Sequence, residues 1–198
     1  MVMRSLLPIV LYVACELIAN VTAMKPVEVA GIVAPGGVFI YALTFTLLDL
    51  INETLGRSGA RRVVAAAFAA NLLLALYTQL IAALPSPSFF DGSDAFLRVF
   101  GATPRIVAAS LAAYLISSLL DVEVFAWWKR RWGIHAWARV LASNAVSTAV
   151  DSFVFVTVAF IGIMPIAPLI GGQYLVKMAV TLITLPLIYA VRSSAGTR

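Results

Sequence analysis

Long apolar runs recur along the whole chain rather than once near its start. A helix needs about 20 apolar residues to cross the hydrocarbon core of a bilayer. A signal peptide before a secreted domain would supply only one run of this kind, and a shorter one. The pattern therefore predicts an all-α polytopic membrane protein, a bundle of six transmembrane helices near residues 5–24, 38–55, 63–84, 105–127, 139–162 and 172–191. We expect residues 1–198 to form a single transmembrane domain.

The segments between these runs have the composition of loops. Proline and glycine mark segments 25–37 and 164–171, and basic residues mark the turns 56–62 and 129–139. The longer segment 85–104 combines phenylalanines with two aspartates. That combination predicts either a short amphipathic helix on the outer leaflet or a lid.

Composition and charge fit a membrane protein. Of all residues, 62% are hydrophobic and 12% are charged, whereas about a quarter of a soluble domain is charged. An ordinary soluble enzyme is thereby excluded. Six crossings place both termini on one side, and ten of the 14 Lys and Arg residues fall there: Arg4, Arg57, Arg61, Arg62, Lys129, Arg130, Arg131, Arg139, Arg192 and Arg198.

Basic loops favour the cytoplasmic side of a membrane. We therefore expect a multi-pass protein of the cell membrane, surrounded by the lipid bilayer, with both termini in the cytoplasm. The same asymmetry accounts for the net charge of +5 without nucleic acid as a partner. Small residues at 65–70 favour a homodimer contact through the third predicted span.

Ionisable residues at membrane depth are the informative ones, because each costs ~2.5 to 3.5 kcal/mol to insert at mid-span. Glu16, Asp49 and Asp151 fall near the middle of their predicted spans, and Lys177 falls nearer the outer face. Such residues should face a cavity or one another.

Helical spacing groups polar side chains into one stripe on each of four predicted spans. The stripes contain Glu16 and Asn20; Tyr41, Phe45, Asp49 and Glu53; Asn144, Thr148 and Asp151; and Gln173 and Lys177. Four stripes that meet in one bundle predict a central polar cavity, and all of these residues except Glu16 are candidate substrate-binding residues. The alternative is that each stripe only joins two helices, for example through an ion pair of Asp151 with Lys177.

The residue types in these stripes suit a flat, nitrogen-rich ligand. Carboxylates accept paired N–H donors, amides donate and accept, and aromatic faces stack on planar rings, which is how a purine-like edge is recognised. Catalysis has little support, because His135 is the only histidine and no glycine-rich phosphate loop is present. Cys15, the only cysteine, excludes a zinc site of clustered cysteines. We expect neither an enzyme nor an ATPase, with no cofactor and no bound metal.

Several longer motifs resemble one known family. The run LTFTLLDLINETLGRSGARR at 43–62, preceded by Asn20, Lys25 and the Pro35-Gly36 loop, is similar to the signature of the VUT family, the queuosine precursor transporter family. Three later stretches agree with the family in order and spacing: RIVAASLAAYLISSLLDVEVF at 105–125, VDSFVFVTVAF at 150–160 and GGQYLVKMAVTLITLPLIYAV at 171–191.

The resemblance implies a six-helix importer of 7-cyano-7-deazaguanine (preQ0), 7-aminomethyl-7-deazaguanine (preQ1) or both, the precursors of queuosine and archaeosine in tRNA. The positions that match the family pattern are Asn20, Lys25, Asp49, Glu53, Arg61, Asp121, Asp151 and Lys177. Thr148 departs from the pattern, since family members commonly have an amide there, and Glu16 lies outside the pattern.

Two other classes of function remain open at this point. The family resembles the vitamin-binding subunits of energy-coupling-factor transporters, which work with a separate ATPase module. A non-transporting structural or assembly protein would use its polar stripes only to hold helices together.

Overall fold

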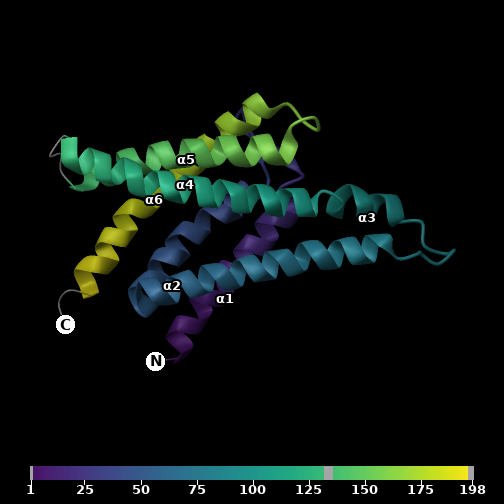
Figure 1. Ribbon diagram of the computed structural model, residues 1–198, viewed down its shortest axis with the longest axis horizontal. Helices are drawn as coiled ribbons and strands as arrows, with labels where there is room; N and C mark the ends of the chain where they lie inside the picture. The colour runs from purple at the N-terminus through teal and green to yellow at the C-terminus, as the bar shows by residue number, and fades with distance from the viewer. Residues whose placement is uncertain (1, 132–135, 196–198) are drawn as a thin grey trace.

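The computed structural model describes the backbone of residues 2–131 and 136–195, and side chains within 6–48, 50–52, 54–56, 58–117, 120 and 144–183. The described chain is mostly helical (Figure 1). Its elements in chain order are α1 (Val2–Thr22), β1 (Pro26–Val29), β2 (Ile32–Pro35), α2 (Val38–Ala83), α3 (Ser93–Phe100), α4 (Thr103–Arg131), α5 (Ala136–Phe160) and α6 (Ile166–Ala195).

Helix covers each of the six ranges predicted to span the membrane, but two of those ranges share α2. Gly56 divides α2 with a φ of 68° and a ψ of 175°, a conformation open to glycine because it has no Cβ. The chain doubles back at this break (Figure 1). The predicted turn 56–62 is therefore too long, since the second half of α2 already begins at Ser58.

Three helices of the described chain are long and apolar enough to cross a membrane, judged by length and composition. They are Ser58–Ala83, Ser93–Ser117 and Ile166–Ile183, while Leu6–Thr22, Val38–Asn52 and Asn144–Phe160 are shorter apolar helices. Large apolar side chains stay on the outside, as for Leu72, Leu73 and Leu76, which are 55%, 67% and 62% exposed. An apolar surface of this kind needs a lipid environment.

The predicted loop 25–37 contains two short strands, an addition to a structure that is otherwise helical as expected. Strands β1 and β2 pair antiparallel, with Pro26 opposite Pro35 and Val29 opposite Ile32. Ala30 and Gly31 form the turn with φ values of 51° and 78°. Two positive φ values in a two-residue turn match the right-handed twist of a hairpin.

Glycine allows this hairpin to dock on the helices. A Cβ on Gly172 of α6 would lie 1.8 Å from the carbonyl oxygen of Val33, and one on Gly37 would lie 2.1 Å from that of Ala19. Only a residue without a side chain permits such close backbone approach. The hairpin therefore packs on α6, and the start of α2 packs on α1.

Two buried apolar clusters hold the helices together. One joins α1 to both halves of α2 and contains Tyr12, Ile51, Ala60, Val63 and Ala67. The other joins the turn after α1 to α4, α5 and α6 and contains Ala23, Ile106, Ala109, Val156, Ala159, Phe160 and Leu169. Arg105 adds a polar link here, since its guanidinium donates to the carbonyls of Val158 and Ile161 at 2.6 and 2.8 Å, near the carboxyl end of α5, where a cation is favourable.

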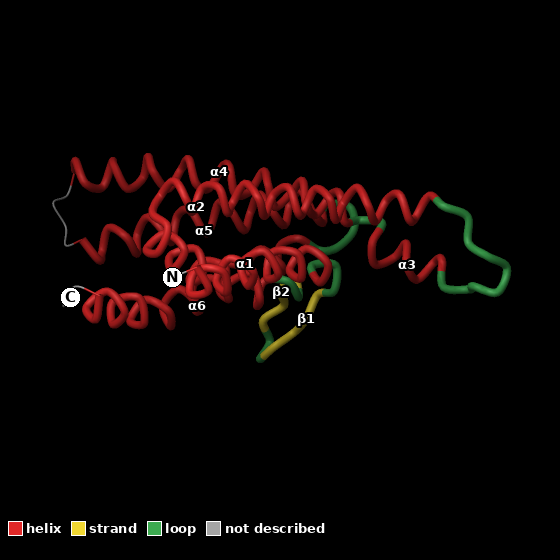
Figure 2. The backbone as a smooth tube through the Cα atoms, turned by 90° about the horizontal axis from the view of Figure 1, so that it is seen from below, coloured by secondary structure: helices red, strands yellow, loops and turns green. Residues whose placement is uncertain are grey.

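Both termini lie toward the same end of the molecule, together with the break in α2 (Figures 1 and 2). At the opposite end lies α3, a short helix within the predicted amphipathic segment, and none of its residues is buried. Gln79 of α2 donates to the carbonyl of Phe100 at 3.3 Å and connects α3 to the end of α2. The candidate site lies beside the second cluster, since Ala23 of that cluster lines it.

Candidate functional site

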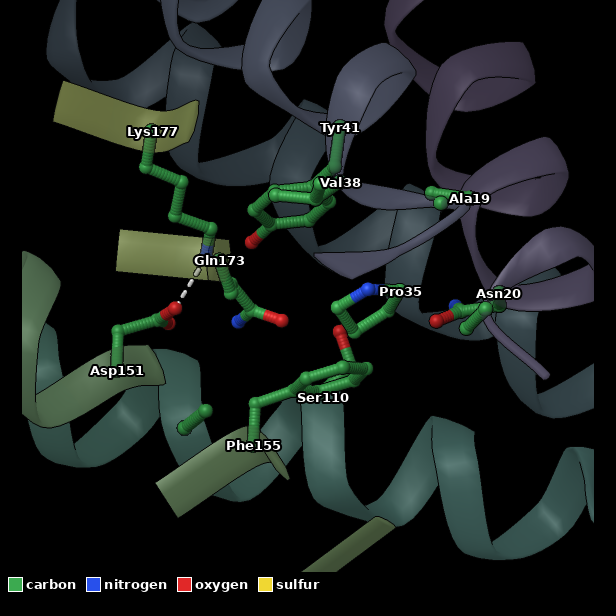
Figure 3. A pocket seen from close by; sticks show the side chains of 13 residues that line it. Ala19, Asn20, Pro35, Val38, Tyr41, Ser110, Asp151, Phe155, Gln173 and Lys177 are labelled. Carbon is green, nitrogen blue, oxygen red and sulfur yellow. Dashed lines mark hydrogen bonds and ion pairs between the residues drawn. The ribbon is translucent and has the colours of Figure 1, made fainter. Parts of the chain in front are cut away.

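A pocket with about 370 Å³ of empty space, part of it open to solvent, lies between α1, the end of β2, the start of α2, α4, α5 and α6. Its wall combines apolar surface with a few polar side chains. The polar lining consists of Asn20, Tyr41, Ser110, Asp151, Gln173 and Lys177 (Figure 3). A largely apolar wall with a few placed polar groups is typical of small-molecule sites.

An ion pair between Lys177 of α6 and Asp151 of α5 lies at one side of the pocket (Figure 3). The two side chains are only 4% and 13% exposed. The ammonium also lies 4.6 Å from the centre of the Tyr41 ring, a favourable cation–π arrangement. The pair therefore presents a buried donor and a partly buried acceptor side by side, with an aromatic face next to them.

Asn20 on the opposite side of the pocket has its orientation set by a residue from α2. Its amide Nδ2 donates to Oδ1 of Asn71 at 2.6 Å, and the amide of Asn71 donates to the carbonyl of Ala67 at 3.0 Å. Both asparagines are buried. This bond connects the pocket to the second half of α2, whose side chains line the pocket nowhere among the residues described.

Asn71→Leu is expected to destabilise the protein by about 1–3 kcal/mol, because the amide N–H of Asn20 would stay buried without its acceptor. Asn71→Asp keeps an acceptor at that position and should cost less. The measurement is thermal unfolding of the purified protein in detergent. Asn52→Leu is the control, since Asn52 is exposed on the same helix, and equal melting temperatures for the two leucine variants would contradict this role.

Five predicted residues line this pocket: Asn20, Tyr41, Asp151, Gln173 and Lys177. Phe45 lies one turn beyond Tyr41, packs edge-on against its ring and is 44% exposed. Half-buried Asn144 and Thr148 belong to α5 but do not line the pocket. Asp49 and Glu53 belong to α2, and their side chains lie outside the described residues.

Helix α4 also contributes to the pocket, although the polar stripes predicted from the sequence do not include it. Ser110 of α4 and Phe155 of α5 line the pocket together with the predicted polar residues. No polar stripe is predicted on the span that contains Ser110. Ser110 and Tyr114 are four residues apart, the same spacing that revealed the other stripes. Asn71 had a comparable signal, as an amide within an otherwise apolar span.

A second, smaller cavity of about 230 Å³ adjoins the pocket through Tyr41 and Ser110, which line both. Glu16, only 7% exposed, borders this cavity together with Tyr12 and Tyr114. In the described part of the chain, no group of three or more His, Cys, Asp or Glu residues could hold a metal ion. The two cavities can therefore offer hydrogen bonds, charge and aromatic faces to a ligand.

Comparison with known proteins identifies the family. A family model described as "Putative vitamin uptake transporter" matches residues 35–191. The chain is 35% identical to "Probable queuosine precursor transporter" of Bacillus subtilis (strain 168), over 88% of this chain and 78% of that protein. It is 30% identical to "Queuosine precursor transporter" of Escherichia coli (strain K12), over 72% and 62%.

A third relative, "Probable queuosine precursor transporter" of Haemophilus influenzae (strain ATCC 51907 / DSM 11121 / KW20 / Rd), is 26% identical over 73% of this chain and 60% of its own length. No solved structure gives a significant match. The family match covers the greater part of the chain and confirms the resemblance seen in its motifs. The chain therefore belongs to the VUT family, the family of transporters that its model describes as "Putative vitamin uptake transporter".

Proposed function

We propose that this protein imports queuosine precursors, 7-cyano-7-deazaguanine, 7-aminomethyl-7-deazaguanine or both, across the cell membrane. Three relatives that carry the name queuosine precursor transporter support the substrate class. In this proposal all six long helical segments cross the bilayer, both termini face the cytoplasm, and the pocket beside Asp151 and Lys177 is the central substrate site. Exposed Ala65, Ala66 and Ala69 of α2 are where we expect a homodimer contact.

One observation supports the substrate most directly, the buried pair of Asp151 and Lys177 in the pocket wall. A deazaguanine has a ring N–H and an amino group next to a carbonyl oxygen. Asp151 would accept from the two nitrogen donors while Lys177 donates to the carbonyl. Tyr41 and Phe155 would stack on the flat rings, and the amide of Gln173 can both donate to and accept from the 7-substituent.

The function test is uptake of labelled 7-cyano-7-deazaguanine by cells that cannot make it. Asp151→Asn keeps the shape of the side chain but loses the charged acceptor, worth about 1.5–3 kcal/mol. The half-saturating substrate concentration should rise about 10- to 100-fold. Asp94→Asn on exposed α3 is the control and should transport normally. Normal uptake by a correctly inserted Asp151→Asn variant would contradict the proposed site.

The second candidate function is a vitamin-binding subunit that works with a separate ATPase module. The description of the family as vitamin uptake transporters favours it. The two candidates differ in what the purified chain does in liposomes. Transport of the deazaguanine by the chain alone supports the first, whereas copurification of an ATPase and binding of a vitamin such as biotin would support the second.

A further inference from the structure

Glu16 is a buried acid that the proposed substrate site does not use. It lies in the second half of α1, is 7% exposed, and borders the smaller cavity rather than the proposed substrate pocket. Among the described residues, the ion pair of Lys177 with Asp151 is the only one within 4.0 Å, so Glu16 has no cation at ion-pair distance there. Tyr12 interacts with Glu16 through a side-chain hydrogen bond, but a carboxylate without a nearby cation at membrane depth is costly, and its position needs an explanation.

Charged and titratable groups on five helices act on Glu16, although those of α5 and α6 line the larger pocket rather than the smaller cavity. Each of them interacts with it electrostatically: Tyr12 and Cys15 of α1, Tyr41 of α2, Tyr114 of α4, Asp151 of α5 and Lys177 of α6. On α2, exposed Arg61 interacts with Tyr114, and the side chains of Asp49 and Glu53 lie outside the described residues. Lys177 is thus the cation among the described groups that act directly on Glu16, and it already forms an ion pair with Asp151.

The charges of this group do not balance. Glu16 and Asp151 supply two carboxylates and Lys177 supplies one ammonium, which leaves one negative charge when all three are ionised. A low-dielectric interior disfavours an unbalanced charge, whereas one bound proton makes the group neutral. Since Lys177 pairs with Asp151, Glu16 is the carboxylate of the three that is left to bind such a proton.

We propose that Glu16 is the proton-binding site of this transporter and couples the entry of one proton to the import of one substrate molecule. The inference rests on the function proposed above. The carboxylate takes a proton from water on the outer side, an O–H bond forms, and the same proton later leaves to cytoplasmic water. Nothing is oxidised or reduced.

The wall shared by the two cavities couples substrate binding in the pocket to proton binding at Glu16. Tyr41 and Ser110 line both. Substrate between Asp151 and Lys177 would expel water from the pocket and occupy the ammonium, and both effects favour the neutral form of Glu16. Substrate release reverses them and frees the proton. By linkage, a proton on Glu16 must strengthen substrate binding by the same factor.

The test uses the purified full-length protein in liposomes with labelled 7-cyano-7-deazaguanine and an acidic outer solution. At one proton per substrate, a difference of one pH unit supports about tenfold accumulation. Glu16→Gln should bring the substrate only to equal concentrations inside and outside, because the amide cannot carry a proton. Glu28→Gln is the matched control on exposed β1 and should accumulate substrate as the wild type does.

Two further measurements keep folding and coupling apart. Glu16→Gln should still exchange labelled for unlabelled substrate at equal pH, and Glu16→Asp, which can bind a proton, should regain accumulation driven by the pH difference. In a weakly buffered detergent solution, wild-type protein should take up about one proton when substrate is added. This last measurement needs no variant and decides the question if Glu16→Gln does not fold.

Three results would overturn the inference while the proposed function stands. They are wild-type accumulation by Glu16→Gln, accumulation that follows a sodium gradient and ignores the pH difference, and substrate binding without proton uptake. Failure of the wild-type protein to bind either deazaguanine is a different result, because it rejects the proposed function itself.

Discussion

Lys177→Met is expected to lower the free energy of unfolding by about 3–5 kcal/mol, because the carboxylate of Asp151, only 13% exposed, would remain without its cation. The side chain of methionine is unbranched and similar in length to that of lysine. The loss of stability therefore comes from the missing charge rather than from an empty space. Lys177 is 4% exposed and also lies over the Tyr41 ring. Unfolding by SDS titration of the protein in mixed micelles measures the difference.

Two control variants separate the ion pair from other effects. Lys25→Met removes an exposed lysine and should change stability by no more than about 0.5 kcal/mol. The double variant Lys177→Met with Asp151→Asn removes both charges and should recover most of the lost stability. A double variant as unstable as Lys177→Met alone would show that the pair does not act as a unit.

Gly172→Ala is expected to destabilise the protein by about 3 kcal/mol, at the upper end of the cost of overpacking. The new Cβ would lie 1.8 Å from the carbonyl oxygen of Val33 and 3.2 Å from the Cβ of Ala34. Both are parts of the hairpin that a rotamer change cannot move aside. Strand β2 must therefore shift, and Pro35, which lines the proposed substrate pocket, shifts with it. Thermal unfolding and deazaguanine binding should both decline.

Gly171→Ala, one residue earlier on α6, is the matched control. A Cβ at Gly171 meets no atom within 4 Å, and alanine is the better helix former by roughly 0.5–1 kcal/mol. The control should therefore unfold at the same temperature as the wild type or at a higher one. Equal stability of the two alanine variants would show that the hairpin does not press on α6.

The hairpin forms part of the wall of the proposed substrate pocket. It packs on α6 at Gly172, and Pro35 at its end lines the pocket. Figure 2 shows the hairpin beside the helices and away from the ends of the chain. A change in hairpin position would thus alter the pocket directly.

Local pattern predicted the helices well and their joints less well. An apolar run of membrane length forms a helix whichever neighbours it packs against. All six predicted ranges accordingly contain helix in the structure. The joint at 56–62 was predicted as a loop, but a single glycine suffices for the bend. The hairpin at 26–35 was missed, because four-residue strands beside proline and glycine read as a loop.

The sequence by itself determined which residues are costly in a membrane and which family the chain belongs to. Spacing along one helix places Glu16 and Asn20 on one face, whatever the partner helices are. The spacing along a helix does not determine how far along that face a cavity extends. Asn144 and Thr148 share a stripe with Asp151, yet only Asp151 lines the pocket.

Only the tertiary structure decided which stripes meet, because contacts between helices depend on how closely and at what depth the helices pack. Gly37 and Gly172 allow the closest of these contacts, because without a Cβ their backbones can touch the neighbouring backbone. Packing joins Lys177 to Asp151 and Asn20 to Asn71. It leaves Glu16 in a separate cavity without a cation at ion-pair distance among the described residues. Residues 26 to 51 positions apart make these pairs, so no local pattern contains them.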